Sequence, residues 1–231
     1  MEWRPYVPVA ARRARARREM NRLRKKSKDI QPIEIAGHAI ARSFWGKRWC
    51  EHLESFSDYA NRLPRGRAYV RNGSVCHLAI QPGRIDAIVS GSELYDVTIR
   101  IDELEASVWK SIRARCSGEI GSMLELLQGK LSREVMAVVT DRTRGLFPGP
   151  GEIRFDCTCP DWASMCKHVA SVLYGVGRRL DDRPESLFLL RGVDTAELIA
   201  TEMTLPDDMA ADDTLADDAL AGIFGIDLDV D

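Results

Sequence analysis

The chain has 231 residues, 45% of them hydrophobic, which is enough for one medium domain with an appended finger or for two small domains. No run of about 18 apolar residues occurs, which excludes a transmembrane helix. The arginine-rich start lacks the apolar core of a secretory signal, although a mitochondrial transit peptide is similarly basic. Six cysteines without such a signal favour a reducing compartment, so we expect a cytoplasmic protein.

The net charge of −2 conceals opposite charges at the two ends of the chain. Residues 1–30 contain eleven Lys and Arg against three acids, whereas residues 192–231 contain twelve acids and no Lys or Arg. Charge separated in this way directs the choice of binding partner. We interpret 1–30 as a basic N-terminal arm, either solvated or ordered by contact with phosphate. Its candidate nucleic-acid contacts are Arg12, Arg13, Arg15, Arg17, Arg18, Arg22, Arg24, Lys25 and Lys26.

An amphipathic helix is predicted over 43–63, with Ser43 as its N-cap. Large apolar side chains recur in it at helical spacing. They are Trp45, Trp49, Leu53 and Phe56. We expect this stripe to pack in the core, and a platform on which nucleic-acid bases stack is the alternative.

The next segment, 63–73, is expected to break the helix because it contains Pro64, Gly66 and Gly73. Alternating apolar residues then predict three strands in an antiparallel meander, with one face packed on the 43–63 helix. The strands are 75–80, 84–89 and 95–101, and three short helices follow over 103–116, 122–128 and 132–140. These elements predict an α+β domain over 31–148.

Four residues of metal-binding type lie close together after this domain. Cys157 and Cys159 are separated by one residue, and Cys166 and His168 follow with the same spacing. Three sulfurs and one imidazole form a complete tetrahedral set for zinc. A complete set leaves no position for a water nucleophile, so the pattern favours one structural zinc ion over a catalytic one.

The local sequence fits this interpretation. Alternation over 152–159 predicts a strand that presents Cys157 and Cys159 on one face. Helical spacing over 169–177 places the second ligand pair at a helix N-terminus, where the dipole favours thiolates. The alternatives are buried free cysteines, a strained disulfide between the first two, or a nucleophile–base pair of Cys166 and His168. The last of these leaves two cysteines without a role.

Cys-x-Cys followed by Cys-x-His, with Pro160 and Asp161 after the second cysteine and Lys167 before the histidine, resembles a SWIM zinc finger. The flanking segments are similar to one bacterial group of SWIM proteins. They are FWGKRW at 44–49, LPRGRAYVRNG at 63–73, GLFPGPGEIRFDCTCPDWASMCKHVA at 145–170, LRGVD at 190–194 and FGIDLD at 224–229. The resemblance implies a non-enzymatic zinc protein, associated with DNA binding or protein contact and often with Swi/Snf-type helicase-like ATPases.

The remaining sequence completes the expected organisation. Residues 149–204 are expected to form the finger, a strand-turn-helix unit, and its following helices. Residues 205–231 form an acidic tail, and both charged termini are expected to be flexible. Within the tail, Ile226, Leu228 and Val230 alternate with acids, so we expect a docking strand there, with a solubilising tail as the alternative.

No nucleotide-binding loop, Gly-x-Ser-x-Gly elbow or His-Glu-x-x-His motif occurs. We therefore expect a protein that is not an enzyme and has no small-molecule substrate or membrane partner. The favoured function is a zinc-stabilised adaptor in a nucleic-acid context, with a Swi/Snf-type helicase-like ATPase as its expected partner. The alternative is direct binding of DNA or RNA by the basic arm and the finger, against which the overall pI of about 6.1 counts.

Overall fold

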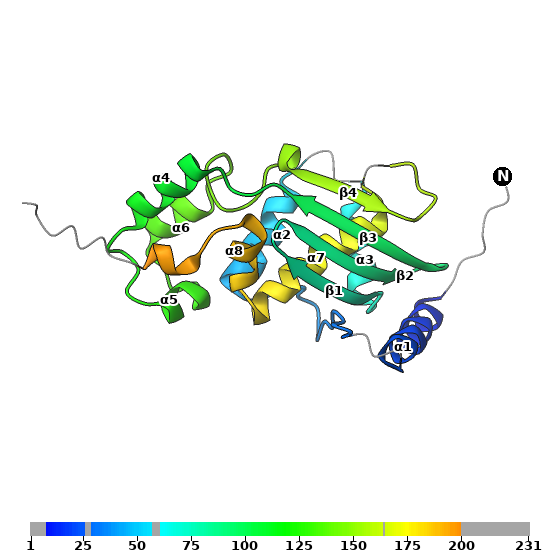
Figure 1. Cartoon of the computed structure of the whole chain (residues 1–231). Coiled ribbons are helices and arrows are strands. Elements are labelled where there is room, and N and C mark those ends of the chain that lie inside the picture. Colours follow the sequence, from blue (N-terminus) through cyan, green and yellow to red (C-terminus); the bar gives the residue numbers. More distant parts are fainter. Residues whose placement is uncertain (1–7, 26–28, 57–60, 164, 200–231) are drawn as a thin grey trace, which may run out of the picture. The chain divides into compact units, whose positions relative to one another are not determined.

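The computed structural model describes residues 8–25, 29–56, 61–163 and 165–199. These residues form a mixed α+β fold with one four-stranded antiparallel sheet, as the sequence predicts (Figure 1). Among them, no helix is long and apolar enough to cross a membrane. The docking strand expected at 226–230 and the rest of the acidic tail lie outside the described residues.

The predicted meander is confirmed, and a fourth strand extends it. The strands lie in the order of the sequence and are β1 (Val75–Gln81), β2 (Arg84–Ser90), β3 (Leu94–Ile101) and β4 (Ile153–Cys157). β4 pairs with β3 in the register Ile101↔Ile153 to Val97↔Cys157. The strand that carries Cys157, the first candidate metal ligand, therefore belongs to the main sheet, because its backbone groups complete the exposed edge of β3.

One helix, α7 (Lys167–Asp182), contacts all four strands of this sheet (Figure 1). The predicted tryptophan helix is α2 (Phe44–Glu54), and the Ser43 side chain caps it by accepting a hydrogen bond from Gly46. α2 packs on α7, so the expectation that it covers the sheet itself is wrong. The physical reason is that α7 is buried over most of its length and packs against both α2 and the sheet.

The predicted break at 63–73 is also wrong, because these residues form helix α3 (Leu63–Arg71). Pro64 occupies the first turn, where a missing N–H is tolerated. Gly66 lies against α7, and a Cβ there would come within 2.4 Å of the Ala170 Cβ. Gly66 therefore allows α3 and α7 to approach closely. In the sequence alone the same glycine indicates a break in the helix, because glycine disfavours helix formation.

The three short helices expected after the meander are present. They are α4 (Ala106–Cys116), α5 (Met123–Gln128) and α6 (Arg133–Val139), followed later by α8 (Glu185–Arg191) and the short 3-10 helices Pro150–Glu152 and Thr195–Leu198. The Trp45 Nε1 donates a hydrogen bond to the carbonyl oxygen of Leu126 at 2.9 Å. This bond joins α2 to α5, and both tryptophans of α2 are fully buried, so the stripe packs in the core as predicted.

Much of the basic arm is a helix, α1 (Val9–Lys25), which contacts β1 and β2. Ala16 is buried in this contact, so this part of the arm is not fully solvated. The boundary expected between 148 and 149 does not separate two packed units, since the described residues on both sides of it belong to one compact unit. It fails because β4 and α7 lie beyond that boundary and are central to the same core.

Candidate metal centre

The end of β4 and the start of α7 bring the four predicted ligands together. Cys157 is the last residue of β4, Cys166 is the N-cap of α7, and His168 is in its first turn. With Cys159 they place one ligand atom each within 4.8 Å of one another. The packing of β4 and α7 in one core therefore holds both ligand pairs on the same site.

The separations between the candidate ligand atoms are close to those that one tetrahedral ion requires. Sulfurs bound at about 2.3 Å to one tetrahedral ion lie about 3.8 Å apart. The Cys157 Sγ lies 3.9 Å from the His168 Nδ1, and the largest separation among the ligand atoms is 4.8 Å. A shift of about 1 Å would complete the tetrahedron. The four residues could therefore hold one metal ion without rearrangement of the fold.

Aromatic side chains fix the orientation of the His168 ring. Tyr95 of β3 stacks on it with 4.3 Å between the ring centroids, and Tyr69 of α3 approaches edge-on at 5.4 Å. The Nδ1 atom faces the sulfurs, whereas the buried Nε2 has no hydrogen-bond partner among the described residues. A Cβ at Gly91 would lie 2.9 Å from this Nε2, so glycine provides the space that the ring requires.

Hydrogen bonds make Cys166 the thiol that ionises most readily. The Cys157 thiol, the His168 ring and the Val169 backbone N–H all lower the pKa of Cys166, and that N–H lies 3.4 Å from its sulfur. The pKa of Cys157 is raised because its thiol donates to Cys166, and burial raises the pKa of Cys159. A thiolate at the helix N-terminus is the form in which cysteine binds metals.

The segment between the two ligand pairs presents an exposed tryptophan. Trp162 is 93% exposed, which is unusual for so large an apolar side chain. The preceding Asp161 accepts a hydrogen bond from the Ala163 backbone and forms an ion pair with Arg62 at 3.4 Å. Trp162 is not among the residues predicted from the sequence, although its position as a large aromatic residue between two candidate ligands, with no apolar periodicity around it, was a usable signal.

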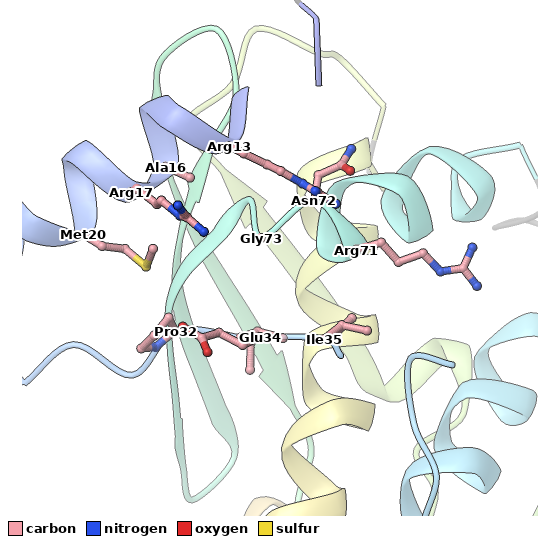
Figure 2. Close-up of a pocket in the computed structure, with 11 residues that line it drawn as sticks. Arg13, Ala16, Arg17, Met20, Pro32, Glu34, Ile35, Arg71, Asn72 and Gly73 are labelled. Carbon is pink, nitrogen blue, oxygen red and sulfur yellow. The ribbon is translucent and has the colours of Figure 1, made fainter. Parts of the chain in front are cut away.

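The basic residues of α1 differ in their surroundings. Arg15 donates to the Ser92 carbonyl oxygen, and Arg22 lies 3.5 Å from Glu19. Arg13 and Arg17 line a pocket beside the residues that follow α3 (Figure 2). Arg18, Arg24 and Lys25 are exposed. The Arg12 side chain and Lys26 lie outside the described residues.

A chain of contacts links α1 to the metal ligands through the turn between β2 and β3. The carbonyl oxygen of Ser92 accepts the bond from Arg15, and its hydroxyl lies 2.6 Å from the Tyr95 hydroxyl. Tyr95 in turn stacks on His168. The predicted arm and the predicted metal site therefore share one structural support, which sequence separation alone does not reveal.

Comparison with known proteins gives one informative similarity. The chain is 32% identical over 176 residues, 75% of its length, to "Uncharacterized protein Rv2102" of Mycobacterium tuberculosis. It covers 63% of that relative, which is less than two thirds of the relative's length. No family model matches the chain, and no solved structure matches it.

Proposed function

We propose that this chain is a cytoplasmic, non-enzymatic, SWIM-type protein that binds one structural zinc ion and acts as an interaction adaptor in a nucleic-acid context. The observation that carries the proposal is the closed set of three cysteines and one histidine, whose ligand atoms lie within 4.8 Å of one another. Three thiolates and an imidazole favour zinc over hard cations such as magnesium and calcium. Four protein ligands leave no open coordination position, which is typical of structural sites.

The adaptor role is supported by the segment that the metal would brace. Trp162 lies between the second and third ligands and is 93% exposed. Tryptophan contributes strongly to protein interfaces when a partner buries it. A bound ion would restrain the loop at both ends and so reduce the ordering cost of docking. By resemblance, the partner we propose is a Swi/Snf-type helicase-like ATPase.

Direct binding of DNA or RNA is the second candidate, and α1 supports it. Seven basic residues lie in this helix between Arg13 and Lys25, and its last turn contains Arg22, Arg24 and Lys25. The contacts of Arg15 through Ser92 and Tyr95 connect the helix to the ligand His168. Zinc would thus stabilise the surface that presents these charges to phosphate.

The metal content of the purified protein tests the first part of the proposal. We expect near-stoichiometric zinc by mass spectrometry in the wild type and its loss in Cys159→Ala. The matched control is Cys50→Ala, which removes a half-buried thiol outside the cluster and should leave the zinc content unchanged. Equal metal content in all three proteins, or none in the wild type, contradicts the proposed site.

Affinity capture from native lysate separates the two candidate functions. If the protein is an adaptor, the wild type and Leu124→Ala should both capture a helicase-like ATPase from nuclease-treated lysate. Trp162→Ala should not capture it. Leu124 is the control because it is also exposed, at 64%, and lies in α5 away from the ligand loop. Partners that are lost on nuclease treatment favour direct nucleic-acid binding instead.

A further inference from the structure

Two adjoining pockets lie between α1 and the segment 31–35, and we name them together the α1 groove. The first has a volume of about 290 Å³ and is lined by Arg13 and Arg17 from α1. The second, of about 360 Å³, is lined by Arg24 from α1 and by Arg178 and Arg179 from the last turns of α7. Both include Pro32, Ile33 and Glu34, so the two pockets adjoin each other along this segment.

The three arginines that α1 contributes to this groove have no ion-pair partner in the part of the chain that the structure describes. Arg13, Arg17 and Arg24 form no hydrogen bond or ion pair with any described residue, whereas Arg15 and Arg22 of the same helix do. Their spacing of four and seven residues places all three on one helix face. Figure 2 shows Arg13 and Arg17 extending from α1 toward Asn72 and Gly73.

The opposite wall of the second pocket carries two further arginines. Arg178 forms an ion pair with Asp182 at 2.9 Å. Arg179 donates to the carbonyl oxygens of Gln31 and Leu78, and its buried Nε has no partner among the described residues. Burial lowers the pKa of Arg179, and the neighbouring Arg178 and Arg183 lower it further. Of the residues that line the groove, Glu34 and Asp182 are the acids.

A groove with cations on both walls is suited to an anion, and its length indicates which kind. Arg13 and Arg24 are eleven residues apart, or about 16 Å along the helix axis. This distance exceeds the size of one phosphate group, so a repeated anion fits the row better than a free ion. Guanidinium groups bind phosphate oxygens through paired N–H donors.

We propose that the α1 groove binds the sugar–phosphate backbone of a nucleic acid, with Arg13 and Arg17 each contacting a phosphate. This site deepens the nucleic-acid-binding candidate of the proposed function and rests on it. Backbone contacts carry no base information, so binding is independent of sequence. Arg71 lines the same pocket, but its side chain runs away from Arg13 and Arg17, so we do not include it (Figure 2).

Fluorescence anisotropy with labelled oligonucleotides, single-stranded and duplex, tests the groove over a series of salt concentrations. The full chain is compared with Arg13→Gln/Arg17→Gln and with Arg133→Gln/Arg144→Gln. The second variant removes the same charge from two exposed arginines at the start of α6 and after it, outside α1. We expect the first to weaken binding equally on unrelated sequences and to reduce the salt slope by about 1 for each arginine. The control should retain most of the wild-type slope.

The possible results decide between the groove and simpler explanations. A charge-retaining Arg13→Lys/Arg17→Lys variant should keep most of the slope, and circular dichroism checks that α1 remains helical in every variant. An equal loss in both glutamine variants refutes the groove but leaves nucleic-acid binding intact. Tight binding of inorganic phosphate that oligonucleotides do not displace indicates a small-anion site and also refutes the proposal. No binding at low salt contradicts both the groove and the nucleic-acid candidate.

Discussion

Replacing Cys166 by serine or by alanine separates two roles that this residue has in the structure. Its sulfur is one of the four candidate metal ligands, and it also accepts the Val169 N–H at 3.4 Å as the N-cap of α7. Serine is a good N-cap but a poor substitute for a thiolate ligand, whereas alanine can do neither. The two variants should therefore differ in stability without metal, and zinc should stabilise both of them equally little.

The expected magnitudes follow from these two roles. In the presence of a chelator, the free energy of unfolding of Cys166→Ala should be about 0.5–2 kcal/mol lower than that of Cys166→Ser, because alanine cannot cap α7. Free zinc at about 1,000 times its Kd stabilises the wild type by about 4.1 kcal/mol. If either variant binds zinc about 1,000-fold more weakly, the same zinc concentration adds only about 0.4 kcal/mol.

Urea denaturation with and without zinc, under reducing conditions, measures both differences. The capping role is contradicted if the two variants are equally stable in chelator. The ligand role fails if Cys166→Ser retains stoichiometric zinc and the full zinc-dependent stabilisation. Cys50→Ala serves as the control, since its thiol lies outside the cluster and its zinc-dependent increment should match the wild type.

Three further predictions concern the core. Trp49→Ala should lower the free energy of unfolding by about 3–5 kcal/mol because the ring is fully buried, whereas Trp162→Ala should change it by less than about 0.5 kcal/mol. If urea denaturation shows similar losses of stability in the two variants, the burial of Trp49 is contradicted. Gly66→Ala should cost about 1–3 kcal/mol through overpacking, and Gly151→Ala, whose Cβ meets nothing within 4 Å, should be neutral in the same assay. Burial lowers the pKa of His52, so the unfolded chain binds a proton at this side chain more tightly than the folded chain does. With a chelator present, the free energy of unfolding should therefore fall as the pH drops below about 6.5, and it should fall less steeply in His52→Gln. Equal pH profiles for the two proteins would refute this.

The sequence alone predicts the elements whose pattern is local. Alternating apolar residues in 84–89 and 95–101 predict β2 and β3, because side-chain direction in a strand depends only on position along the chain. Ser43 and the spacing of Trp45 and Trp49 predict α2 in the same way. The candidate metal ligands also belong to this class, since their spacing and residue types predict a coordination chemistry before any fold is known, and the structure brings the four residues together.

The tertiary structure alone decides what depends on partners distant in the sequence. Gly66 permits the approach of α3 to Ala170 of α7, so a residue that opposes helix formation in isolation here allows two helices to pack. Likewise β4 joins β3 across more than fifty residues, and no local pattern specifies that pairing. Local propensities amount to fractions of a kcal/mol per residue, whereas the burial of a helix face contributes several kcal/mol, so packing determines the outcome where the two conflict.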